Sequence, residues 1–185
     1  MKKFSTWLAV ILLAAGLGIV APGPASATTS YCGLVWGSLA KADPDMGTAN
    51  VTNVTNVRTG QHYCFDRMVV DLNGTPAGYT VRYVPQIVQD GSGFTIPVRG
   101  NGRLQVTVNA PAYDGNGNST YTPADPNELS NAAGYQTFRQ VVWAGSYEGY
   151  TSIGLGVRAR LPFRVFTLDG PGSGSRLVVD VAHYW

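Results

Sequence analysis

Two stretches of the chain repeat one pattern of charged and apolar residues, and they are the first candidates for chemistry. Each places an arginine, three apolar residues and an aspartate in a row, within FDRMVVDLNG (65–74) and GSRLVVDVAH (174–183). Side chains alternate along a strand, so Arg67 and Asp71 share one face, while the residues on either side of Val69 share the other. A face with a cation and an anion at its two ends can bind a ligand, or its charges can pair with opposite charges on a neighbouring strand.

Catalytic chemistry has few candidate residues. The histidines are His62 and His183, and the chain contains neither a G-x-S-x-G nucleophile motif nor an H-E-x-x-H metal motif. Glu148 could form a carboxylate pair with one of several aspartates, but any set of 11 acidic residues allows such pairs. The sequence therefore does not predict an enzyme.

The stretch DGNGNSTYTPAD, residues 114–125, resembles a calcium-binding loop in part. Its Asp, Asn and Thr residues occupy the ligand positions of the EF-hand pattern. Ser119 stands where that pattern needs glycine, and Asp125 stands where it needs glutamate. We therefore expect a polar loop and predict no metal and no cofactor, while calcium binding by this loop stays an open alternative.

The first residues have the features of a signal peptide. Two lysines precede an apolar run from Trp7 to Val20, and the small residues Ala25-Ser26-Ala27 follow. This order predicts residues 1–27 as a leader that is cleaved after Ala27. The apolar run is shorter than the roughly 20 residues that span a bilayer. We therefore expect a secreted protein, extracellular or associated with the cell wall, with no membrane insertion after cleavage.

The charge of the chain argues against some partners. The full chain has 13 basic and 11 acidic residues, and loss of the leader removes Lys2 and Lys3. A balanced charge gives no long-range attraction to nucleic acid or to an anionic membrane. We therefore expect no nucleic-acid partner.

The cysteines Cys32 and Cys64 are predicted to form one disulfide, because an even cysteine count in an exported chain favours a bond. Their Cα atoms are expected to lie about 4.4–6.8 Å apart. The bond would tie an N-terminal segment, residues 28–48, to the strand with the first charged pattern. Residues 49–185 would then form the main domain.

Short alternating stretches bounded by Gly, Pro, Asn and Asp recur along the chain, and helical periodicity is scarce. They predict an all-β fold, a two-sheet β-sandwich of about nine short, mostly antiparallel strands. One long loop, Ala110–Gln136, breaks the pattern, and loops of that length are usually functional or disordered. The expected strands are Asn50–Arg58, Tyr63–Leu72, Tyr79–Ile87, Gly93–Arg99, Arg103–Asn109, Thr137–Trp143, Thr151–Arg158, Phe163–Leu168 and Arg176–His183.

Aromatic residues are concentrated between Tyr113 and Tyr150. A flat apolar ring with a polar tip suits sugar rings and protein interfaces. We expect Phe138 and Trp143 to fill the core. Tyr113 and Tyr121 lie in the long loop and are candidates for ligand binding.

The order of several motifs resembles the AMIN-like domain of secreted bacterial proteins, which is related to the AMIN domain of cell-wall amidases and secretion channels. The stretch FRVFTLDGPGSGSRLVVDV (163–181) is similar to the terminal AMIN signature, and YCFDRMVVDLNG is similar to an earlier AMIN strand. The motifs YCGLVWGSL, YTVRYV and WAGSYEGYTSIGLGV add to the match. The resemblance extends from about Tyr31 to Val181.

The resemblance implies a β-sandwich that serves as a non-catalytic binding module of the bacterial cell envelope and recognises peptidoglycan or another wall glycan. Carried over to this chain, it places Arg67, Asp71, Arg176 and Asp180 on outer faces that bind the ligand. Arginine suits the carboxylates of peptidoglycan stem peptides. The alternative is a protein–protein interaction module without glycan affinity, which would bind an envelope protein through the 110–136 loop and nearby aromatics.

The two charged patterns can be arranged in two ways. If their strands pair antiparallel, Arg67 faces Asp180 and Asp71 faces Arg176, and each opposite-charge pair contributes roughly 0.2–1 kcal/mol. The internal symmetry of the family instead implies corresponding strands in different sheets, with both faces open to solvent. We expect separate sheets, and a salt bridge between Arg67 and Asp180 would give both arginines a structural role.

Overall fold

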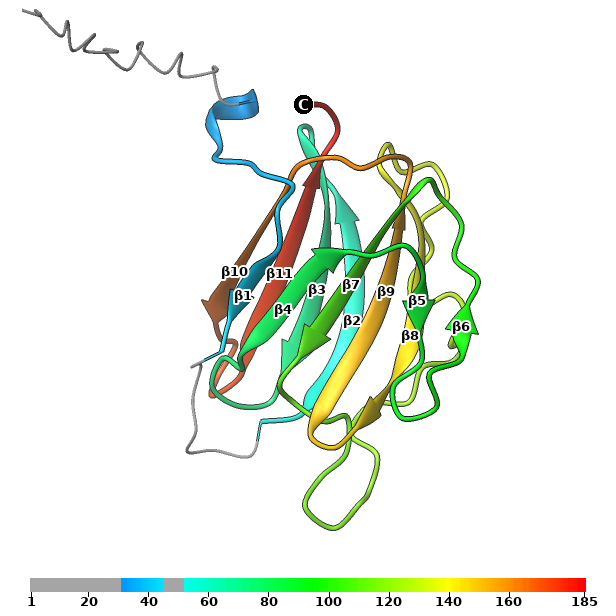
Figure 1. Cartoon of the computed structure of the whole chain (residues 1–185). Helices are drawn as coiled ribbons and strands as arrows, with labels where there is room; N and C mark the ends of the chain where they lie inside the picture. The colour runs from blue at the N-terminus through cyan, green and yellow to red at the C-terminus, as the bar shows by residue number, and fades with distance from the viewer. Residues whose placement is uncertain (1–30, 45–51) are drawn as a thin grey trace, which may run out of the picture.

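The computed structural model describes residues 31–44 and 52–185, which fold as two antiparallel β-sheets packed face to face (Figure 1). A short 3-10 helix, η1 (Tyr31–Gly33), precedes the strands. The strands are β1 (Lys41–Asp43), β2 (Val54–Gln61), β3 (Phe65–Leu72), β4 (Tyr79–Tyr83), β5 (Ile87–Val88), β6 (Thr95–Ile96), β7 (Gly102–Val108), β8 (Phe138–Tyr147), β9 (Tyr150–Val157), β10 (Phe163–Asp169) and β11 (Ser175–Ala182). The predicted all-β sandwich is confirmed.

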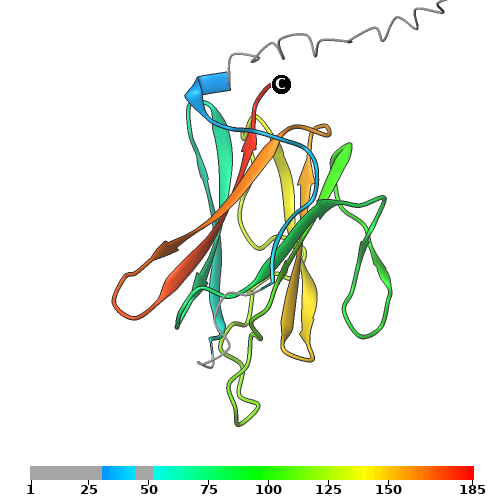
Figure 2. The same ribbon diagram turned by 60° about the vertical axis from the view of Figure 1, so that its left-hand side comes forward.

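The strands divide into two main layers and a small hairpin. Sheet A has the order β10-β11-β3-β2, and sheet B has the order β1-β4-β7-β9-β8. The two sheets lie on opposite sides of the core, as the turned view shows (Figure 2). The hairpin β5–β6 forms a separate two-stranded sheet.

The core follows from the two-residue period of the strands. Every second residue of β3 and β11 points inward between the sheets and meets the apolar residues of β7 and β9. The six residues that the sequence placed in the core are all at most 4% exposed and belong to one cluster, which confirms that prediction: Met68, Val70, Leu72, Leu177, Val179 and Val181.

The long loop 110–136 contains no named strand, as expected, and it closes one open side of the sandwich. It contacts β2 through Thr59, whose hydroxyl lies 2.7 Å from the hydroxyl of Ser130. It contacts β8 through backbone hydrogen bonds, since the amide of Trp143 donates to the carbonyl of Pro126 at 2.7 Å. The loop therefore supplies partners to strands at the edges of both sheets.

The N-terminal segment closes the opposite side. The amide of Phe163 in β10 donates to the carbonyl of Gly37, and β1 pairs with β4. Cys32 and Cys64 are joined by a disulfide with a Cα separation of 6.3 Å, which confirms that prediction. The signal peptide predicted at residues 1–27 lies outside the described residues, and the domain limits 28–48 and 49–185 stay predictions.

Two prolines explain two of the differences between the expected and the observed strands. Proline has no amide hydrogen for a sheet ladder. Pro85 divides the expected strand Tyr79–Ile87 into β4 and β5, and Pro97 leaves only β6 from the stretch 93–99. The strand β1 was not expected from the sequence, and residue 50, where another strand was expected to begin, is not described.

Glycines on β9 allow the β5–β6 hairpin to pack on the outer face of sheet B. A side chain at Gly154 would collide with Ile87, and one at Gly156 would collide with the backbone of Arg99. The hairpin and sheet B share a second apolar cluster formed by Ile87, Val98, Val142 and Ala144. The outer face of sheet B is thus partly covered, which directs attention to the outer face of sheet A.

Candidate functional site

The two charged patterns lie on adjacent strands of one sheet, so the expectation that they occupy different sheets is wrong. Strand β11 pairs antiparallel with β3, and this register opposes Arg67 to Asp180 and Arg176 to Asp71. The apolar residues Val69 and Val178 face each other between the two charged pairs. Antiparallel pairing places opposite charges across from each other twice, and this complementarity favours the observed register.

The first pair is a structural ion pair. The Arg67 guanidinium donates two hydrogen bonds to the Asp180 carboxylate, at 2.6 and 2.9 Å. Arg164 of β10 contacts the same carboxylate at 2.7 Å. The side chain of Asp180 is fully buried, whereas those of Arg67 and Arg164 are 22% and 26% exposed. One buried anion therefore holds two arginines together across three strands.

Aromatic rings enclose these two arginines. Both guanidinium groups lie over the rings of Phe65 and Phe166, at 4.9 to 5.4 Å from the ring centroids. Arg164 also lies over Trp36, which comes from the N-terminal segment. Cation–π contacts of this kind add to the ion pair. The sequence-based criterion, a salt bridge between Arg67 and Asp180, is met, and it assigned both Arg67 and Arg176 a structural role. Of these two arginines the ion pair itself engages only Arg67, so it disfavours ligand binding by Arg67 and does not account for Arg176.

The second opposed pair does not form an ion pair. Asp71 instead accepts two hydrogen bonds from Arg58 of β2, at 2.8 and 3.0 Å. These bonds raise the pKa of Arg58 above its ordinary value. Arg176 donates to the backbone carbonyl of Asp169, and its Nε atom is buried without a hydrogen-bond partner. Ligand binding by Asp71, Arg176 and Asp180 stays a prediction.

Six charged residues of β2, β3, β10 and β11 point outward from sheet A, and we call them the charged face: Arg58, Arg67, Asp71, Arg164, Arg176 and Asp180. Sequence reasoning missed Arg58 and Arg164. Their strands were expected, but an alternating pattern shows which face a residue occupies and not which strands become neighbours.

The loop candidates Tyr113 and Tyr121 line one open pocket of about 380 Å³ with Trp143 of β8. The Tyr121 and Trp143 rings meet edge to face, with centroids 5.5 Å apart. Burial raises the pKa of Tyr121. Trp143 packs against the core, as expected, and it also lines this pocket. We call it the aromatic pocket; its wall also includes the hydroxyl residues Ser119, Thr122 and Ser146.

Hydrogen bonds between side chains and backbone groups hold the aromatic pocket in place. The side-chain amide of Asn53 donates to the carbonyl of Tyr113 at 2.6 Å, and Asn53 is 3% exposed. The hydroxyl of Tyr113 accepts a hydrogen bond from the amide of Gly149 in the β8–β9 turn. The hydroxyl of Thr120 donates to the carbonyl of Val54 in β2. Neighbouring strands therefore fix the path of the loop.

In the 114–125 loop, the candidate calcium-binding loop, the first carboxylate already accepts hydrogen bonds from within the loop. Asp114 accepts hydrogen bonds from the amides of Asn116 and Asn118 and from the side chain of Asn118. The bond from the Asn118 side chain is the main cause of a lowered pKa at Asp114. Within residues 31–44 and 52–185, no group of three or more His, Cys, Asp and Glu residues could hold a metal ion.

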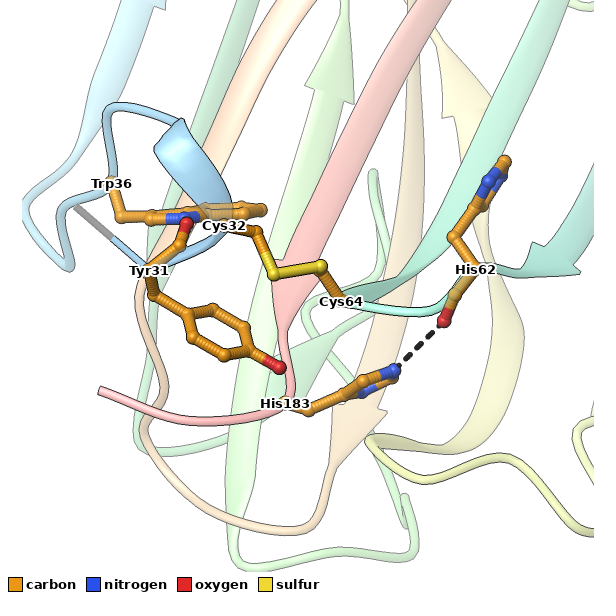
Figure 3. Close-up of a disulfide and its surroundings, with 6 residues drawn as sticks. All are labelled: Tyr31, Cys32, Trp36, His62, Cys64 and His183. Carbon is orange, nitrogen blue, oxygen red and sulfur yellow. Dashed lines mark hydrogen bonds between the residues drawn. A yellow bond between two sulfur atoms is a disulfide. The ribbon is translucent and has the colours of Figure 1, made fainter.

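The histidines lie near the disulfide (Figure 3). His183 is buried, and its Nε2 atom donates to the carbonyl of His62 at 3.0 Å. Its Nδ1 atom lies 3.0 Å from the hydroxyl of Thr137. The ring of His62 stacks on Phe65. Both ring nitrogens of His183 thus have partners that join the end of β11 to neighbouring segments.

Among the described residues, no helix has the length and apolar character that a membrane crossing requires. The family model of the AMIN-like domain matches residues 52–183, which include both charged patterns and the aromatic pocket. Comparisons with curated proteins and with solved structures gave no match.

Proposed function

The chain belongs to the AMIN-like family, and from this premise we propose that it is a non-catalytic binding module of the bacterial cell envelope that recognises peptidoglycan or another wall glycan. The aromatic pocket is the observation that carries the proposal. It combines exposed ring surface with hydroxyl groups on an anchored loop.

The chemistry of the pocket suits a sugar. Pyranose rings have apolar faces that stack on aromatic side chains and hydroxyl groups that need hydrogen-bond partners. Tyr113, Tyr121 and Trp143 supply the rings, and the hydroxyls of Ser119 and Thr122 lie on the wall. A volume of about 380 Å³ falls within the usual range for small-molecule sites. The pocket is open, as the binding of one segment of a long polymer requires.

The disulfide fits an exported protein, because such bonds persist in oxidising compartments. We therefore place the protein outside the cell or at the cell wall, after removal of the predicted leader. Its partner is then a glycan that the wall presents at high density.

The test is sedimentation of the secreted protein with insoluble peptidoglycan, together with titration of a soluble N-acetylglucosamine oligomer. Tyr121→Ala is expected to weaken oligomer binding by about tenfold, in line with the loss of one stacked ring. Tyr63→Ala is the matched control, because Tyr63 is 95% exposed in the β2–β3 turn and lies outside the pocket. It is expected to bind as the unchanged protein does.

Equal binding by both variants would overturn the aromatic pocket as the glycan site. Failure of the unchanged protein to bind any wall fraction would overturn the glycan proposal itself. Capture of an envelope protein that competes at Tyr121 would then favour the alternative interaction module.

A further inference from the structure

We propose that Arg176 is the centre of an oxyanion-binding site on the charged face, which takes a carboxylate or phosphate group. This inference rests on the proposed function, because it assigns the acidic groups of a wall polymer to a second site. A pocket of about 220 Å³ opens here, and we call it the arginine pocket. It is lined by Arg58, His62, Arg67, Val69, Arg176 and Val178.

The first argument is that one of two equivalent ion pairs is missing. The register opposes Arg67 to Asp180 and Arg176 to Asp71. Only the first pair forms, because Arg58 takes the carboxylate of Asp71. Within the described residues, no carboxylate lies within 4.0 Å of Arg176. A guanidinium without a carboxylate partner can bind an external anion.

The second argument is the balance of charge. The charged face has the arginines 58, 67, 164 and 176 but only the aspartates 71 and 180. Asp180 is shared by two arginines, so its single negative charge leaves one positive charge uncompensated. None of the residues that line the arginine pocket is acidic. Cations above a low-dielectric surface attract anions more strongly than the same cations in water.

The third argument is the unsatisfied donor on Arg176. Its Nε atom is buried and has no hydrogen-bond partner, and one bond to the Asp169 carbonyl holds its Nη2 atom. An unpaired buried donor is costly, so a rearrangement that pairs it is favourable. The planar guanidinium can offer two parallel donors to a carboxylate or a phosphate. Val69 and Val178, both nearly buried, supply apolar surface to the same pocket.

The direct test titrates inorganic phosphate, and separately acetate, into the full chain and follows the arginine side-chain resonances by NMR. We expect Arg176 to respond to both anions. Arg176→Gln is expected to weaken phosphate binding by about tenfold, since it removes one charge-assisted contact. Arg82→Gln is the matched control, because it removes the same charge from an exposed position of β4 in the other sheet.

Two further variants act on Arg176 through its neighbours and should have opposite effects. Asp71→Asn frees Arg58 and is expected to increase phosphate affinity, whereas Arg58→Gln lets Asp71 pair with Arg176 and is expected to decrease it. Thermal unfolding of each variant identifies any loss of fold. Equal phosphate affinity of Arg176→Gln and Arg82→Gln, or equal effects of the two neighbour variants, would overturn the proposal.

Wall fractions identify the source of the anion. Hydrofluoric acid removes phosphodiester polymers from the wall and leaves stem-peptide carboxylates, whereas amidation removes those carboxylates. Loss of Arg176-dependent binding after the first treatment supports phosphate, loss after the second supports carboxylate, and no change after both would contradict the site. Arg176→Gln should bind the neutral sugar oligomer normally, so failure of this site is distinguishable from failure of the aromatic pocket.

Discussion

The charged face and the aromatic pocket use their side chains in opposite ways. On the charged face, strand pairing commits most charged groups to one another, and Asp180 is fully buried between Arg67 and Arg164. In the aromatic pocket, buried backbone contacts hold the loop, while the rings of Tyr113 and Tyr121 line an open surface. A strand face presents residues to its neighbours, whereas an anchored loop presents them to solvent.

This difference shows why a repeated motif is not by itself a ligand site. The repeat places equivalent residues on two strands, and antiparallel pairing then makes them partners. Of the two opposed pairs, Arg176 and Asp71 do not form an ion pair, and the Nε atom of Arg176 is left without a hydrogen-bond partner. The four predictions below separate the two regions by stability and by binding.

The largest effect is expected for Asp180→Ala. The change leaves Arg67 and Arg164 partly buried without their shared anion, and it should lower the free energy of unfolding by about 3–5 kcal/mol. Urea unfolding followed by tryptophan fluorescence measures the change. Sugar binding by the folded fraction should persist, because Asp180 lies outside the aromatic pocket. A cost below 1 kcal/mol would show that the buried charges are not coupled.

A smaller effect on stability is expected for Asn53→Ala, together with a clear effect on the aromatic pocket. The change removes the hydrogen bond that fixes the carbonyl of Tyr113, at a cost of about 1–3 kcal/mol. The displaced Tyr113 ring should weaken oligomer binding, while phosphate binding at Arg176 stays the same. Calorimetry with both ligands provides the comparison. Parallel loss of both affinities would mean that the two regions are not independent.

Acid is expected to loosen the loop through Asp114. Its folded-state pKa is below the ordinary value, so its contribution to stability is present above the ordinary pKa and is lost as the pH falls through the folded-state pKa. Oligomer affinity should therefore decrease at low pH. Asp114→Asn should show the weakened state at neutral pH and a flatter profile. An unchanged acid profile in this variant would assign the effect to another group.

The smallest effect is expected for Arg58→Ala. The Arg58 side chain of this pair is half exposed, and ion pairs at the surface contribute about 0–1 kcal/mol. The unfolding free energy should therefore change little, and high salt should abolish the difference because exposed pairs are screened. Denaturant unfolding at low and high salt checks this. A loss comparable to that of Asp180→Ala would contradict the distinction between exposed and buried pairs.

The sequence predicted much of the fold because the signals are local. Alternation in the 65–72 and 175–182 strands identified the buried face, and the cysteine pair identified the disulfide. The irregular stretch 110–136 was correctly identified as a loop. The limits of β4 to β6 were less accurate, since the effect of Pro85 and Pro97 depends on where hydrogen-bond partners lie.

The candidate sites were less predictable. The sequence named Tyr113 and Tyr121, but it assigned Trp143 only to the core, although this ring also lines the pocket. Nothing local connects Asn53 to Tyr113, which are 60 residues apart. Their contact depends on the loop crossing from sheet B to β2.

The sequence by itself determined which residues of each strand share a face, because the two-residue period is a property of the single chain. It also determined that antiparallel pairing would oppose Arg67 to Asp180. Only the tertiary structure decided that β3 and β11 are neighbours, that Arg164 joins Asp180, and that Arg58 takes Asp71 from Arg176. Strand neighbours depend on how both sheets bury their apolar faces together, and that free energy belongs to the whole sandwich and to no single stretch.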